Sequence, residues 1–430
     1  MSVCQNEGYE SRKTMKAAMY SCAKCMYNIG AEADKVVLLQ SSLLLGFWHS
    51  EADQHVQPWY WTGISVGLCQ ILGLHRNPDA TRRNSAITDQ QRHLWRRLWW
   101  TCFFRDRWLS LTLGRPMRID LNDCDVPMTS AADLQSDVAA IPASTAASFI
   151  PHDLSWMAQH WVTLIEMSKI LGAVLKLNYQ TLRARPSLAQ VEALEAEIML
   201  CQPSADVEPG LSRESVFYIH HLQLHYQTIL IMFYRIYRSE TPDGLDPSHQ
   251  QRWQQRMRRE ADAAASRTNE TLDMLAQEGL LEFALPMTPP LLVPAMQIHL
   301  LNCNSANPLS RRLQLNKLNT CVMVMEEFQK TYTVASIYRE IFGKAVQHFY
   351  PTDIAPMDTS ANIAAVPANT LHTPAPASAR DAGDNGQRNS PFDASYANIN
   401  TEITSDLIDS LVDETSVSDF WEAWGQLWVE

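Results

Sequence analysis

Apolar residues recur at intervals of three and four over long stretches of this 430-residue chain, while alternating runs of β-branched residues are almost absent. This spacing puts apolar side chains on one face of an α-helix and does not suit a half-buried strand. We therefore expect an all-α fold. Because 46% of the residues are hydrophobic, the chain can bury at least one large core.

The helical pattern runs through residues 1–351, which we assign to one multi-helical domain. Expected helices cover 11–49 with a break near Gly30, 57–72, 88–112, 154–184, 187–201, 212–238, 247–278, 289–303, 308–330 and 334–349. Thr88 and Gln91 have the spacing of a capping box, in which each side chain satisfies the other residue's backbone amide. Gly114, followed by Pro116, is a typical helix end.

Two segments of this domain are predicted to be irregular. Residues 129–152 are rich in Ala, Ser and Pro, which indicates a loop between two helical parts. Prolines at 286, 289, 290 and 294 are expected in a linker or a first helical turn. The reason is that a proline inside a helix lacks the amide proton and clashes with the preceding turn.

Residues 352–430 differ from the rest in composition and charge. Of the formal net charge of −12, residues 1–351 carry −1, residues 352–400 carry −3 and residues 401–430 carry −8. Residues 352–404 have the Ala, Pro, Ser and Asn composition of a disordered linker. Residues 405–430 interleave acids with large apolar groups, as amphipathic activation segments do; the expected partner contacts are Phe420, Trp421, Trp424, Leu427 and Trp428. The alternative is a terminal helix that packs on the protein's own body.

Cysteine usage and hydropathy limit the cellular environments that suit this chain. The nine cysteines lack regular spacing, which favours reduced thiols. The longest apolar runs are shorter than a membrane span. We expect an intracellular protein that does not enter a membrane.

One short motif allows a chemical interpretation that its surroundings do not favour. Gly63-Ile-Ser65-Val-Gly67 matches the nucleophile elbow of serine hydrolases, but that motif needs a strand before it. A helical stripe through Trp61, Ile64 and Leu68 instead leaves Ser65 off the buried face, with the two glycines forming a surface for a closely packed helix.

Histidine, cysteine and arginine clusters are equally weak as functional signals. His221 and His225 lie four residues apart on a helix beside His220, yet no third metal ligand is indicated, so core or surface histidines are favoured. Cys22 and Cys25 lack the second pair that a zinc site needs. The arginines at 92, 96 and 97 and at 252, 256, 258 and 259 fit solvated helix faces better than phosphate contacts.

Asp106 is the residue that most needs an explanation. It falls within an apolar stripe of the 88–112 helix, together with Trp95, Trp99 and Cys102. A carboxylate among apolar groups is costly unless a cation pairs with it. We expect that cation to be Arg115, since Arg107 is adjacent in sequence and adjacent residues face different directions.

Five linked motifs, in this order and spacing, resemble the fungal-specific transcription factor domain, the middle homology region of fungal zinc binuclear cluster regulators. The residues that carry the resemblance are Leu72, Gly73, His75, Arg76, Leu98, Trp99, Trp100, Asp106, Arg107, Gly114, Arg115, Pro116, Asp125 and Pro127. The likeness extends at lower strength from about residue 30 to residue 350.

The resemblance implies a nuclear, non-enzymatic regulator of RNA polymerase II transcription of a pathway or gene cluster. Partners would be the transcription machinery or a coactivator, and another transcription factor in a homo- or heterodimer. Family members bind DNA through a cluster of six cysteines that holds zinc, a pattern into which the cysteines of this sequence cannot be arranged. Neither zinc nor direct DNA contact is therefore assigned to any residue here, and no other cofactor is expected. The alternatives are a ligand-sensing or inhibitory partner that heterodimerises with a full-length activator and, more distantly, a serine hydrolase that uses Ser65.

Overall fold

The computed structural model describes residues 8–47, 57–79, 87–138, 141–180, 182–350, 408, 410 and 411, without the side chains of residues 137 and 149. Regular structure in these ranges is helical, and the extended pairing found there is one isolated bridge between Ser187 and Asp243. The predicted all-α fold is confirmed. In the same ranges, no helix is both long enough and apolar enough to cross a membrane.

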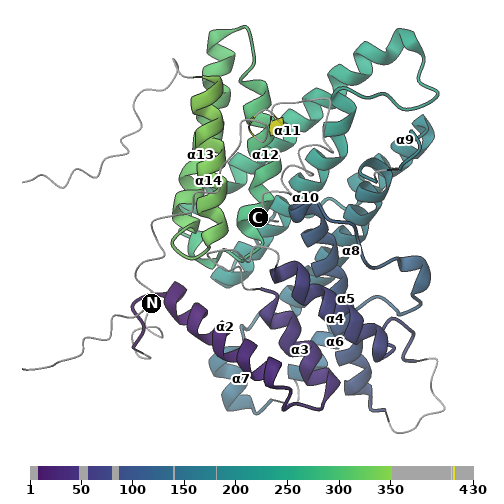
Figure 1. Ribbon diagram of the computed structural model, residues 1–430, viewed down its shortest axis with the longest axis vertical. Helices are drawn as coiled ribbons and strands as arrows, with labels where there is room; N and C mark the ends of the chain where they lie inside the picture. Colours follow the sequence, from purple (N-terminus) through teal and green to yellow (C-terminus); the bar gives the residue numbers. More distant parts are fainter. Residues whose placement is uncertain are drawn as a thin grey trace, which may run out of the picture.

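In the first half of the body, helices that are consecutive in the sequence from α2 to α6 pack against one another (Figure 1). It contains α2 (Arg12–Ile29), α3 (Lys35–Leu45), α4 (Gln57–Ile71), α5 (Asp89–Leu113), the 3₁₀ turn η1 (Leu121–Asp123), α6 (Ala131–Val138), α7 (Ala143–Phe149) and α8 (Leu154–Asn178). Helix α4 packs between α3 and α5, and α5 packs on α8. The short helix α6 contacts both α5 and α8.

The second half is built around α10 and α12. It contains α9 (Leu188–Leu200), α10 (Arg213–Arg235), η2 (Ile236–Arg238), η3 (Pro247–His249), α11 (Gln250–Gln277), η4 (Leu281–Phe283), α12 (Thr288–Asn302), α13 (Pro308–Phe328) and α14 (Thr333–Phe349). Helix α10 joins the two halves because it packs on α8 as well as on α11 and α12. Figure 1 shows α13 and α14 side by side in green at the outer edge, where both contact α12.

Helix ends follow the local signals in the sequence. The Thr88 side chain accepts from the Gln91 amide at 3.2 Å, and the Gln91 side chain accepts from the Thr88 amide at 3.0 Å, so the predicted capping box is confirmed. Gly30 and Gly114 end α2 and α5 with φ of 71° and 60°, a left-handed conformation that suits glycine.

Two predictions about irregular segments are wrong. Residues 129–152, expected to form a loop, contain α6 and α7. The prolines of α12 are the second case, because Pro289 and Pro290 do lie in the first turn but Pro294 lies inside the helix. Every residue from Thr288 to Leu301 is buried, so packing on all sides of α12 outweighs the backbone hydrogen bond that Pro294 cannot make.

The predicted linker at 352–404 lies outside the described residues, as do Phe420, Trp421, Trp424, Leu427 and Trp428 of the tail. Three tail residues are described, and two of them are buried. Ile408 is 7% exposed and Leu411 is 0% exposed, and both belong to the hydrophobic core of the body. At these two positions the tail therefore packs on the protein's own helices, which is the alternative that the sequence interpretation placed second.

Candidate functional site

The motif residues 72–76 form the turn that leaves α4. Gly73 has φ of 71°, and the Leu74 amide donates to the Cys69 carbonyl at 2.9 Å. This geometry directs Leu74 inward, where only 3% of its surface is exposed. His75 follows with its ring 6.1 Å from that of Trp99 on α5.

The distant segment 125–127 is bound to this turn. The Asp125 amide donates to the His75 carbonyl at 3.2 Å, and the Asn77 amide donates to Oδ1 of Asp125 at 2.7 Å. Arg76 pairs with Oδ2 of Asp125 at 3.1 Å. Two residues further on, the Pro127 carbonyl accepts from Nε1 of Trp100 at 2.8 Å. Three of the motifs recognised in the sequence therefore meet at one place.

Asp106 is the polar centre of the same region and is 0% exposed. Arg107 Nη1 donates to its Oδ2 at 2.5 Å. The Arg118 amide donates to both carboxylate oxygens at 3.0 and 3.1 Å, and the Ile119 amide donates to Oδ2 at 3.1 Å. The predicted pairing with Arg115 is wrong, because the long Arg107 side chain bends back along its own helix and the chain after Gly114 returns to supply two amides.

Arg107 is held on several sides. It is 3% exposed, and its Nη2 donates to the Ile119 carbonyl at 2.5 Å. Its guanidinium lies 4.4 Å from the centre of the Phe103 ring. A Cβ placed on Gly172 of α8 would lie 2.7 Å from Nε of Arg107, so any larger residue there would force the Arg107 side chain to shift. The sequence interpretation missed Gly172, although a glycine within an apolar helix is a recognisable signal of close packing.

Burial raises the pKa of Asp106, and the charge of Arg107 and the two amides act in the opposite direction. Burial also lowers the pKa of Arg107, against the charge of Asp106. Both carboxylate oxygens of Asp106 already accept hydrogen bonds inside the protein, which fits a structural role better than proton transfer. The contacts of the pair join α5, α8 and the segment after α5.

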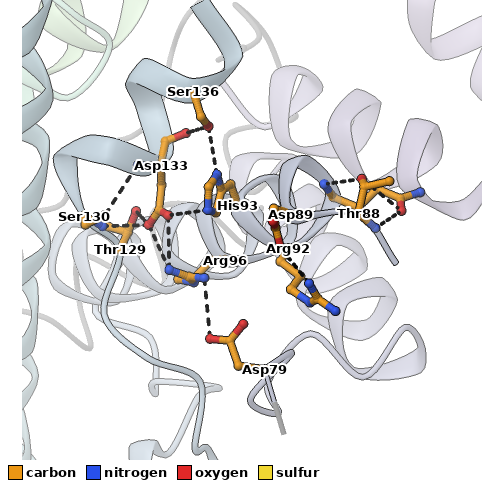
Figure 2. A network of polar contacts seen from close by, with 11 residues as sticks. Asp79, Thr88, Asp89, Arg92, His93, Arg96, Thr129, Ser130, Asp133 and Ser136 are labelled. Atoms are coloured by element: carbon orange, nitrogen blue, oxygen red, sulfur yellow. Dashed lines mark hydrogen bonds and ion pairs between the residues drawn. The ribbon is translucent and has the colours of Figure 1, made fainter. Parts of the chain in front are cut away.

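The arginines near the start of α5 contact acidic residues (Figure 2). Arg96 pairs with Asp133 of α6 at 3.1 Å and with Asp79 at 3.7 Å, and Arg92 pairs with Asp89 at 2.7 Å. His93 lies beside Arg96, with Nδ1 2.8 Å from Oγ of Ser136. The expected solvated face is wrong for Arg96, whose side chain is only 13% exposed. Its charge holds α6 against α5.

Ser65 lies in the middle of α4 and is 0% exposed. Its hydroxyl donates to the Trp61 carbonyl at 2.9 Å and lies 2.8 Å from Oγ of Ser42. The predicted stripe is wrong, because the buried face of α4 contains Ser65 and a small hydroxyl side chain lets α3 approach closely. The two glycines were expected to face a closely packed helix, and this is wrong as well. Gly63 faces the Arg118 side chain, and a Cβ added to Gly67 would have no other atom within 4 Å.

The three histidines of α10 are core residues, as expected. His220 is 6% exposed, His221 is 3% exposed and His225 is 0% exposed. Nδ1 of His225 donates to the His221 carbonyl at 2.8 Å, and its ring lies 4.4 Å from that of Trp108. In the described part of the chain, no three potential ligands form a metal site. Cys22 and Cys25 are exposed on α2.

In the second arginine cluster, Arg252, Arg258 and Arg259 are exposed on α11, as the solvated-face prediction has it, and Arg256 differs. Arg256 on α11 donates to Glu195 on α9, and its guanidinium lies 5.7 Å from the centre of the Trp253 ring.

A comparison with known protein families identifies the family to which this chain belongs. The family model described as fungal specific transcription factor domain matches residues 4–262, which include the turn at 72–76, the Asp106–Arg107 pair and the segment 125–127. The chain belongs to this family. The fungal specific transcription factor domain match ends within α11, while α12, α13 and α14 pack on the same core.

Several curated proteins resemble the chain. Cutinase transcription factor 1 beta of Fusarium vanettenii is 27% identical over 376 residues, which cover 78% of this chain and 42% of that protein. Transcription factor cpaR of Aspergillus oryzae is 25% identical over 69% of this chain and 54% of its own length. The acetamidase regulatory protein of Emericella nidulans is 36% identical over 135 residues, or 31% of this chain and 16% of that protein. The chain thus spans about half or less of these relatives. No solved structure matches it.

Proposed function

We propose that this chain is a non-enzymatic regulator of RNA polymerase II transcription that acts in the nucleus on the genes of a pathway or gene cluster. The observation that carries the proposal is the family match over residues 4–262, within which hydrogen bonds link motif residues to one another and to neighbouring segments. The names of the relatives, all transcription factors or regulatory proteins, support it.

A structural role for the motif residues fits this function. The Asp106 carboxylate is buried and bonded to Arg107 and to two backbone amides, and the Trp100 indole is bonded to the Pro127 carbonyl. The buried, hydrogen-bonded hydroxyl of Ser65 supports packing rather than nucleophilic catalysis.

We further propose that the aromatic end of the tail recruits the transcription machinery. Burial of Ile408 and Leu411 supports a division of the tail, in which residues near 411 attach to the body and the aromatic groups from Phe420 to Trp428 bind the partner. Acids among these aromatic groups fit a segment that folds in a partner's groove.

A reporter experiment tests both proposals. The full chain is fused to an unrelated DNA-binding domain, and transcription is measured from a promoter that carries its sites. We expect activation, and we expect the triple change Trp421→Ala, Trp424→Ala and Trp428→Ala to remove most of it because the partner contacts are lost. The matched control is Tyr60→Ala, which removes an aromatic group that is 57% exposed on α4 and should leave activity intact.

The outcomes separate the two claims. A silent reporter with a stably expressed, nuclear fusion would contradict activation by this chain. Full activity of the triple variant would contradict the role of the tail but not the regulatory function.

A further inference from the structure

Helix α2 has an apolar face that is directed away from the body. None of its residues is buried. Its inner side rests on α4, where Nε1 of Trp61 donates to the Tyr20 hydroxyl at 3.0 Å and the Tyr27 ring lies 5.1 Å from that of Trp61. Because an α-helix turns by about 100° per residue, the opposite side carries six exposed residues. We call this set the outer face: Ala18, Met19, Cys22, Cys25, Met26 and Ile29.

The apolar side chains of the outer face are open to solvent. Met19 is 53% exposed, Met26 is 67% exposed and Ile29 is 71% exposed. Cys22 and Cys25 are exposed as well. Figure 1 shows α2 in purple at the edge of the body. An apolar surface of this kind, left open on an otherwise packed domain, marks a contact with another protein.

The charged residues of α2 lie outside the outer face. All of them are basic: Arg12, Lys13, Lys16 and Lys24. Nζ of Lys16 lies 4.6 Å from the centre of the Tyr332 ring, and Nζ of Lys24 lies 5.8 Å from that of Tyr20, so both lysines are on the inner side. An acidic segment such as residues 405–430 would need basic groups along the outer face. The face instead suits a helix whose own contact surface is uncharged.

The outer face repeats after seven residues. Ala18 is followed by Cys25, Met19 by Met26, and Cys22 by Ile29. Such a repeat stays in register only with a helix of the same period. A second copy of α2 has the same period and the same uncharged face, so the surface is complementary to itself, as a two-fold interface requires. The small Ala and Cys side chains let two helices approach closely, and Met adapts its shape to the partner.

We propose that the outer face of α2 pairs with the outer face of α2 in a second copy of this chain. The contact goes beyond the proposed function and does not depend on the role of the tail. One helix pair of this length is near the lower limit of specific interfaces, which bury about 1,000 Å² in total. We therefore expect a weak dimer that dissociates on dilution.

Sedimentation velocity of the full chain, over a hundredfold range of concentration, tests this contact. We expect the average mass to rise with concentration towards that of two chains. Met19→Glu combined with Met26→Glu should weaken association at least tenfold, because four carboxylates would face one another across the interface. The matched control is Leu309→Glu combined with Leu313→Glu on α13, where the side chains are 68% and 53% exposed. It adds the same charge elsewhere and should associate like the original chain. A monomer at every concentration, or equal association of the α2 variant, would overturn the proposal.

Cys22 and Cys25 provide a second measurement in the unchanged chain. A short bismaleimide adds one thiol at each end, so it should join two copies through these cysteines. Mass spectrometry of peptides from mixed ¹⁴N and ¹⁵N chains identifies links between copies. Cys22→Ser combined with Cys25→Ser should remove the links, and their absence from the original chain under dimer conditions would contradict the location of the contact.

The rate at which maleimide modifies Cys22 separates a second copy from the chain's own tail. Protection by a second copy should disappear on dilution. Protection at every concentration, lost in the triple change Trp421→Ala, Trp424→Ala and Trp428→Ala, would mean that the tail covers the outer face. That result would overturn the second copy as occupant, whatever the reporter experiment shows about activation.

Discussion

Asp106 and Arg107 are adjacent in the sequence, and an α-helix directs adjacent Cβ atoms about 100° apart. They nevertheless form an ion pair, because the arginine side chain is long enough to bend around the helix surface. The space for that bend exists because α8 has no side chain at Gly172. A functional motif on one helix therefore depends on a single glycine on another.

Gly172→Ala tests this dependence. The new Cβ would lie 2.7 Å from Nε of Arg107, so we expect a loss of about 1–3 kcal/mol in the free energy of unfolding, measured with urea. Gly67→Ala is the matched control, since that helical glycine has nothing within 4 Å of an added Cβ, and it should gain about 0.5–1 kcal/mol from helix propensity. Equal effects of the two changes would show that Gly172 is not needed for the pair.

Asp106→Asn tests the pair itself. It leaves the buried Arg107 guanidinium without a carboxylate, and we expect a loss of about 3–5 kcal/mol in the free energy of unfolding. Asp125→Asn is the comparison. That carboxylate is 49% exposed and its Oδ1 can still accept from the Asn77 amide, so the loss should be no more than about 1 kcal/mol. Unchanged thermal stability of Asp106→Asn would contradict the central role of the pair.

At the scale of elements, α5 depends on both local and tertiary contacts. Its start is set locally by the Thr88 capping box, while Arg96 near the start pairs with Asp133 and so holds α6 (Figure 2). Without this ion pair, the Ala- and Ser-rich segment after residue 129 has little apolar surface to fix it as a helix. This is why the sequence pattern indicated a loop there.

Thr88→Ala should cost about 1 kcal/mol in the free energy of unfolding, because it leaves the Gln91 amide without its acceptor. Thr101→Ala, the same substitution inside α5, is the control. Its hydroxyl donates only to the Arg97 carbonyl one turn earlier, a contact that does not stabilise a helix, so stability should stay the same or rise slightly. A smaller effect at Thr88 than at Thr101 would contradict the importance of the cap.

At the scale of the whole molecule, buried histidines make stability depend on pH. Burial lowers the pKa of His160 to about 3 and those of His225 and His299 to about 4, and it lowers that of His221 as well. The unfolded chain, in which histidine titrates near 6.5, therefore binds more protons than the folded chain between about pH 4 and 6.5. Stability should fall as the pH drops through this range, by up to about 1.4 kcal/mol per pH unit for each histidine.

His225→Phe checks this dependence in melting curves recorded from pH 7 to pH 5. Phenylalanine keeps an aromatic ring beside Trp108 and Phe104 and cannot bind a proton, so the pH slope should become shallower. His249→Asn changes an exposed histidine and should leave the slope unchanged. The same slope in His225→Phe as in the original chain would contradict the assignment.

The contact of the tail with the body is also a property of the whole molecule. Leu411→Asp would put a charge at a position that is 0% exposed in the core, and we expect the melting temperature of the body to fall by several degrees. Leu182→Asp is the control, because Leu182 is 97% exposed. If Leu411→Asp left the melting temperature and the proteolysis pattern unchanged, residue 411 would not be part of the core in solution.

Much of the architecture could be predicted because it depends on residues that are close in sequence. The helices, the Thr88 capping box and the glycine ends at Gly30 and Gly114 follow from local spacing and backbone conformation. The candidate site was harder to predict from the sequence. Asp106 could be recognised as buried and in need of a cation, but its partner depended on where α8 and residues 118–119 lie.

The sequence by itself determined that this chain is helical, where most helices begin and end, and which motifs mark it as a fungal specific transcription factor domain. Periodicity and caps act within a few residues, so they can be followed along one chain. Only the tertiary structure decided that Arg107 pairs with Asp106, that Ser65 faces the core, that Pro294 lies inside a helix and that Leu411 is buried. These outcomes depend on charges and volumes supplied by helices far away in sequence, and burial makes such contacts energetically dominant.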